Sequence, residues 1–76
     1  MSNDELDRVG GVRVLLRSGV ATSVREAAAL SRTEFARRLG VDPATVWRWE
    51  CGLRSPRTRV ALQLADLYAE LIGGSE

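Results

Sequence analysis

The 76-residue sequence contains no histidine, no lysine and only one cysteine, Cys51. Histidine is the most common general base and the usual activator of a serine or cysteine nucleophile, so its absence argues against both kinds of catalysis. One cysteine can form neither an internal disulfide nor, with carboxylates alone, a structural zinc site. We therefore expect a protein that is not an enzyme and that holds no metal or other cofactor.

Long apolar stretches are also missing. No run approaches the roughly 20 residues that span a bilayer, and residues 2–5 are polar or acidic, unlike the basic start of a signal peptide. Apolar residues nevertheless make up 45% of the chain, which suits a folded domain with one modest core. These features predict a cytoplasmic protein that makes no membrane contact.

The positive charge is concentrated in the middle of the chain. Residues 31–59 carry seven arginines and three acids, whereas residues 1–30 are balanced and residues 60–76 carry three acids and no base. A basic segment of this kind is typical of a surface that faces a phosphate backbone. All the bases are arginine, which suits bidentate phosphate and guanine contacts, although codon usage in a GC-rich genome would give the same bias.

The first 19 residues carry the weakest signals. Residues 2–4 can cap a short helix, but Gly10 and Gly11 are expected to interrupt it. We therefore expect a flexible arm and a short helix over residues 1–19, followed by a domain over residues 20–76.

Apolar stripes predict helices at both ends of that domain. Ser23 and Glu26 form a possible capping box for its first helix, which can instead begin near Val20. Ser55 and Pro56 resemble the N-cap and the first residue of a long last helix. The apolar side chains of this helix recur three or four residues apart, on one face: Val60, Leu64, Leu67 and Leu71.

Two further helices are separated by a very short turn. A capping box that begins at Ser31 starts the first of them, and Gly40 ends it. Asp42 then caps the second, which Gly52 ends. Only residues 40–42 lie between the two, and a three-residue turn containing glycine is what joins the helices of a helix-turn-helix.

This part of the chain resembles the Cro/cI (Xre) family of helix-turn-helix regulators. The matching residues are Arg25, Leu30-Ser31, Glu34-Phe35-Ala36, Leu39-Gly40-Val41, Thr45-Val46, Trp49-Glu50, Gly52 and Pro56. The resemblance implies an all-α fold, a small Cro/cI-like helix-turn-helix domain of four to five helices. It also implies a sequence-specific regulator of transcription that binds double-stranded DNA, as a dimeric repressor of bacterial or phage origin.

The resemblance places base contacts on the second helix of the motif, which enters the major groove, at Pro43, Ala44, Trp47 and Arg48. Only Arg48 can form the bidentate hydrogen bonds that recognise guanine, while Pro43 and Ala44 can only touch a thymine methyl group. Few of these side chains can therefore form hydrogen bonds to bases, and DNA shape is expected to supply part of the specificity. Two alternatives stay open, because Arg48 can also clamp a phosphate and Trp47 can pack against the protein.

Phosphate contacts are expected on either side of that helix. The free amides at the start of the preceding helix attract a phosphate near Ser31 and Arg32. Thr45 is expected to add a contact, and Arg54 and Arg57 to bind the backbone beyond the reading helix. Each of these arginines can also be a solvated surface charge.

The resemblance also implies that Arg25 and Glu50 form a structural ion pair beneath the DNA-facing surface. Losing one partner should then cost far more than losing both, because it leaves a buried charge unpaired.

A homodimer is expected, because a helix with so few base contacts gains specificity when two symmetric half-sites are read together. The interface can lie on the long last helix or on residues 6–16. Two rival functions remain open. One is a factor that bends DNA during recombination, and the other is an antitoxin or similar interaction module whose protein partner binds the last helix.

Overall fold

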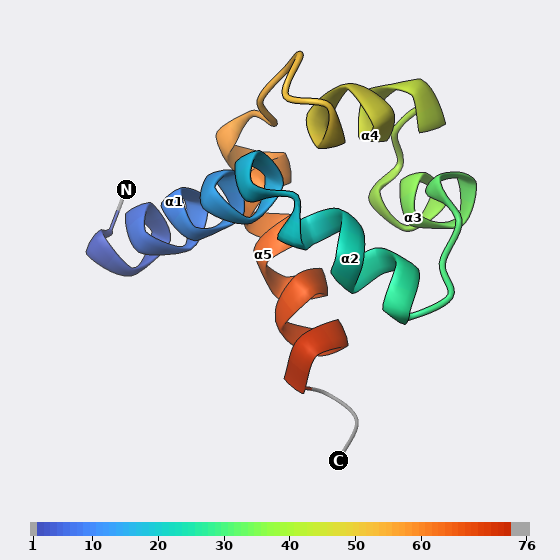
Figure 1. Cartoon of the computed structure of the whole chain (residues 1–76). Coiled ribbons are helices and arrows are strands. Elements are labelled where there is room, and N and C mark those ends of the chain that lie inside the picture. The colour runs from blue at the N-terminus through green and yellow to red at the C-terminus, as the bar shows by residue number, and fades with distance from the viewer. Residues whose placement is uncertain (1, 74–76) are drawn as a thin grey trace.

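The computed structural model describes residues 2–73, which form five helices and no strand (Figure 1). The helices are α1 (Asn3–Ser18), α2 (Val20–Ala27), α3 (Arg32–Leu39), α4 (Pro43–Glu50) and α5 (Thr58–Gly73). The prediction of a small all-α fold is therefore confirmed. Residues 1 and 74–76, which the predicted arm and domain include, lie outside the described part of the chain.

The N-terminal segment is a single sixteen-residue helix, which corrects the expectation of a flexible arm and a short helix. A capping box formed by Ser2 and Glu5 starts it. Gly10 and Gly11 lie inside the helix, where each weakens it by about 0.5–1 kcal/mol relative to alanine. One face of α1 buries three aliphatic side chains, Val9, Val12 and Leu16. Each of these contributes about 1.5–3 kcal/mol when fully buried, so packing outweighs the two glycines.

α2 adopts the earlier of the two starts that the sequence left open. It begins at Val20, directly after Gly19, whose left-handed backbone ends α1. Ser23 lies inside the helix and donates its hydroxyl to the Gly19 carbonyl at 3.5 Å. The capping box predicted for Ser23 and Glu26 therefore does not form.

α5 begins at Thr58, later than the start predicted at Ser55 and Pro56. Residues 54–57 have no regular structure, and Pro56 is buried, so the proline packs into the domain instead of opening the helix. The predicted apolar face is present, with four buried side chains: Ala61, Leu64, Leu67 and Tyr68.

One core holds the five helices together. α1 packs across α5, which also contacts α2 and α3, and α3 packs against α4 (Figure 1). Inside the core, the rings of Phe35 and Tyr68 lie with their centroids 5.5 Å apart. Because α1 shares this core, it is an integral part of the domain. No helix within residues 2–73 is long and apolar enough to cross a membrane.

Candidate nucleic-acid interface

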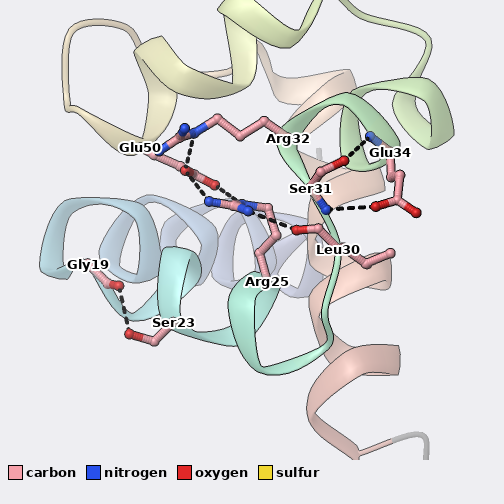
Figure 2. Close-up of polar contacts among 8 residues, drawn as sticks. All are labelled: Gly19, Ser23, Arg25, Leu30, Ser31, Arg32, Glu34 and Glu50. Carbon is pink, nitrogen blue, oxygen red and sulfur yellow. Dashed lines mark hydrogen bonds and ion pairs between the residues drawn. The ribbon is translucent and has the colours of Figure 1, made fainter.

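α3 starts with the capping box predicted at Ser31 (Figure 2). The Glu34 N–H donates to Ser31 Oγ at 3.1 Å, and the Ser31 N–H donates to Glu34 Oε1 at 2.9 Å. The hydrogen bond from the Ser31 backbone is the main reason that the pKa of Glu34 lies below its usual value. Residues 31–34 are exposed, so the positive end of the α3 dipole faces solvent.

The turn between α3 and α4 is built around Gly40, whose φ of 71° lies in the left-handed region. The Val41 N–H donates to the Ala36 carbonyl at 3.0 Å, a bond of the Schellman type that closes the end of α3. A Cβ at Gly40 would strain this conformation. On the other side, Asp42 Oδ1 accepts from the Ala44 N–H at 3.3 Å and caps α4. The chain therefore reverses within three residues.

One side of α4 is buried and the other faces solvent. Val46 and Trp49 are buried in the core. The four residues predicted to contact bases lie on the other side: Pro43, Ala44, Trp47 and Arg48. Ala44 is half-buried and the other three are exposed. The exposed fraction of Trp47 is 45%, so part of the indole rests on the protein and part is free to contact a ligand.

Behind this surface, the structure brings Arg25 and Glu50 together (Figure 2). Arg25 Nε donates to Glu50 Oε2 at 2.7 Å and Arg25 Nη2 donates to Glu50 Oε1 at 3.1 Å, a bidentate pair. The Nη1 atom of Arg25 donates to the Leu30 carbonyl at 2.8 Å. The two side chains are only 7% and 3% exposed. The pair therefore ties α2, the segment before α3 and the last turn of α4 together in a site that excludes most water.

Arg32 joins this pair, and we refer to Arg25, Arg32 and Glu50 as the ion cluster. Arg32 Nε donates to Glu50 Oε1 at 3.0 Å, across a separation of 18 residues. Sequence reasoning missed this bond because no local spacing links the two positions. The Arg32 side chain is 43% exposed, so it spans from the buried carboxylate to the surface.

Burial and hydrogen bonding oppose each other at Glu50. Burial by itself raises the pKa of this carboxyl, but hydrogen bonds from Arg25 and Arg32 outweigh burial and leave the pKa below its usual value. The same hydrogen bond with Glu50 raises the pKa of Arg25. Arg25 and Glu50 are therefore both charged at neutral pH.

Four of the five residues predicted to contact phosphates lie in two pairs, and the fifth lies alone on α4. Ser31 and Arg32 are in the exposed first turn of α3, which the ion cluster holds near the C-terminal end of α4. Arg54 and Arg57 are exposed in the segment that leaves that same end of α4. Thr45 is half-buried on α4 itself.

The family comparison covers most of this arrangement. The Helix-turn-helix domain family matches residues 21–70, which include α3, the turn and α4 and leave α1 outside. No curated protein and no solved structure matches the chain. The resemblance inferred from the sequence is thus confirmed, and the chain belongs to the helix-turn-helix domain family, within its Xre/Cro-type class.

Proposed function

We propose that this protein is a sequence-specific regulator of transcription that binds double-stranded DNA and acts as a dimeric repressor in a bacterium or a phage. Its family indicates a DNA-binding regulator. The observation that carries the proposal is the two-sided character of α4, which is fixed by Val46 and Trp49 on one side and presents Trp47 and Arg48 on the other. A helix of this kind fits the major groove, where its exposed side contacts base edges.

Arg48 is the principal base-reading residue. Its exposed guanidinium suits the O6 and N7 acceptors of guanine, and one such bidentate contact discriminates against the wrong base by about 1–3 kcal/mol. Pro43 and Ala44 contact thymine methyl groups, and the exposed part of Trp47 covers a methyl group or a sugar. Because only one of these residues forms hydrogen bonds to a base, DNA shape supplies part of the specificity.

Phosphate contacts hold α4 in register. Ser31 and Arg32 receive one phosphate at the first turn of α3, where free amides and the helix dipole attract an anion. Arg32 uses only its Nε in the ion cluster, so both of its Nη atoms remain available as donors. Thr45 adds a contact from α4, and Arg54 and Arg57 bind the backbone beyond it.

A second copy of the chain occupies the apolar groove between α1 and α5. The groove has a volume of about 370 Å³ and is lined by Arg8, Val12, Leu15 and Tyr68, by the small residues Gly11, Ala65 and Ala69, and by Ile72. The exposed fraction of Ile72 is 60%, so one face carries both a protruding side chain and a recess that is lined partly by small residues. A two-fold interface needs this kind of self-complementary face. Both segments that the sequence suggested for the interface contribute to it.

Selection of bound duplexes from a random library at physiological salt tests the DNA-binding part of the proposal. We expect a two-fold symmetric consensus whose half-sites lie about one helical turn apart. Arg48→Ala should weaken binding to that sequence roughly 5- to 150-fold, which corresponds to about 1–3 kcal/mol, and should relax one base preference. Arg59→Ala removes the same charge from an exposed position on α5 to which no contact is assigned, and it should leave the preference intact. Weak, salt-sensitive binding without an enriched sequence would refute sequence specificity.

Analytical ultracentrifugation over a range of concentrations tests the dimer. A monomer both free and on DNA would contradict it. If the function in cells survives Arg48→Glu and depends instead on a different protein bound at the α1 and α5 groove, the protein is an interaction module of the antitoxin kind and not a repressor.

A further inference from the structure

A second hollow, with a volume of about 350 Å³, lies between the C-terminal half of α1 and the segment that follows α4. Its lining combines a buried apolar floor with a polar rim. The floor includes Leu16, Trp49 and Pro56, and the rim is made by Arg13, Arg17, Arg54 and Ser55. Of the rim residues, only Arg54 belongs to the interface described above.

Three arginines line this hollow, and the described residues of its lining include no acidic one. Within residues 2–73, none of the three forms an ion pair with a carboxylate. Arg13 and Arg17 are four residues apart on one face of α1, a spacing at which like charges repel each other. The helix dipole accounts for Arg17 in the last turn of α1, but not for Arg54, which approaches from another segment. A concave site with converging guanidinium groups is suited to a phosphate group.

The hollow adjoins the C-terminal end of α4, the helix proposed to read DNA. Trp49 and Gly52 in its lining lie at the end of α4, and α1 contacts α4 there. The Arg54 N–H donates to the Arg48 carbonyl at 3.3 Å. This bond ties the backbone of Arg54, in the lining of the hollow, to the backbone of the proposed base-reading residue.

We propose that this hollow binds one phosphodiester group of the DNA backbone beside the bases that α4 reads, so that α1 adds Arg13 and Arg17 to the DNA-binding surface. The inference rests on the proposed function. It gives a DNA-binding role to α1, which lies outside the segment that matches the family. The rim arginines are all exposed, so the hollow is open to a polymer backbone that passes across it.

Salt dependence of DNA affinity gives the first readout, with Arg13→Gln/Arg17→Gln compared with the unmodified protein. Both positions are exposed and glutamine is a good helix former, so the thermal midpoint should not change. The slope of log affinity against log salt concentration should decrease in magnitude by about 1. Arg59→Gln is the matched control, because it removes the same charge from an exposed helical position that lines neither this hollow nor the groove between α1 and α5. The control should keep the slope, and its assembly state is measured in parallel.

DNA with single neutral methylphosphonate linkages gives the second readout. The unmodified protein should lose affinity when one phosphate that flanks each half-site is neutralised. The double variant should be insensitive at that phosphate and should respond normally at the others, since the two changes remove the same contact.

The outcomes separate this inference from the proposed function. If the unmodified protein binds its selected duplex and the double variant keeps both the slope and the methylphosphonate pattern, the inference is wrong and the proposed function stands. If the unmodified protein binds no duplex, both are wrong. A third outcome is that inorganic phosphate, at constant ionic strength, binds the unmodified protein but not the double variant, while both proteins bind DNA equally well. The hollow would then bind a free anion, and the inference would likewise be overturned.

Discussion

Replacing Arg25 by methionine would remove the side chain that neutralises a carboxylate buried where α2, α3 and α4 meet. The Glu50 side chain is only 3% exposed, and its remaining cationic neighbour would be Arg32, whose side chain is 43% exposed. The bond from Arg25 to the Leu30 carbonyl would also be lost. Breaking a buried ion pair from one side costs about 3–5 kcal/mol. Because Arg32 still donates to Glu50, we expect a loss near the lower end, about 3 kcal/mol.

A loss of this size is a large part of the total stability. A 76-residue domain has a free energy of unfolding of about 4–11 kcal/mol. In a domain of this size, 1 kcal/mol shifts the thermal midpoint by about 4–8 °C, so Arg25→Met should lower the midpoint by roughly 12–24 °C. Far-ultraviolet circular dichroism at neutral pH measures this shift directly.

The double variant Arg25→Met/Glu50→Leu separates the unpaired charge from the lost contacts. With both charges removed, no ion remains buried without a partner, so the double variant should lose much less stability than the two single variants together. If each single variant loses less than about 1 kcal/mol, the pair behaves like an exposed salt bridge and the reasoning fails. It also fails if the double variant loses the sum of the two single losses.

Four other positions give predictions that urea denaturation can check. Gly10→Ala should raise the free energy of unfolding by about 0.5–1 kcal/mol, because Gly10 is helical and an added Cβ meets nothing within 4 Å. The matched change Gly40→Ala should lower it by about 1–2 kcal/mol, since alanine would have to adopt a φ of 71°; equal effects of the two would contradict this explanation. Ser31→Ala removes the acceptor of the Glu34 N–H and should cost about 1 kcal/mol, whereas Ser31→Asp keeps an acceptor and should cost less. The pKa of Glu50 is lowered in the folded state, so its contribution to stability is complete above the ordinary value of 4.5 and is lost as the pH falls through the folded value. Glu50→Gln should therefore reduce the acid sensitivity, and an unchanged pH profile would count against the role of this carboxylate.

The helix-turn-helix part was predictable because its signals are local. The capping box at Ser31, the left-handed Gly40 and the cap at Asp42 each involve residues only a few positions apart, and the structure confirms all three. The length of α1 and the start of α5 were predicted wrongly because tertiary packing decides them. Gly10 weakens an isolated helix, but burial against α5 keeps α1 continuous. Pro56 is a favourable first residue of a helix, but its burial places it before the start of α5.

The candidate site also has a part that local spacing predicts and a part that only tertiary packing decides. The helical period and two buried residues, Val46 and Trp49, are enough to predict which residues of α4 face outward. The bond between Arg32 and Glu50 depends on how α3 packs against α4, and the position of Arg13 and Arg54 in one hollow depends on how α1 packs against the segment after α4. Neither has a spacing that could be recognised from the chain alone.

Glu50 connects the packing of the domain with the proposed contact surface. One of its oxygens, Oε1, accepts from both Arg25 Nη2 and Arg32 Nε, so the same atom anchors a buried and a half-exposed guanidinium. An Arg32 side chain held at Nε has less conformational freedom to lose when its Nη atoms bind a phosphate. Variants at Glu50 that stay folded should therefore bind DNA more weakly, without any direct contact between Glu50 and DNA. If Glu50→Gln weakens binding in the presence of Arg32 but not in an Arg32→Ala background, the effect passes through Arg32. Equal weakening in both backgrounds would show that the carboxylate acts only by stabilising the fold.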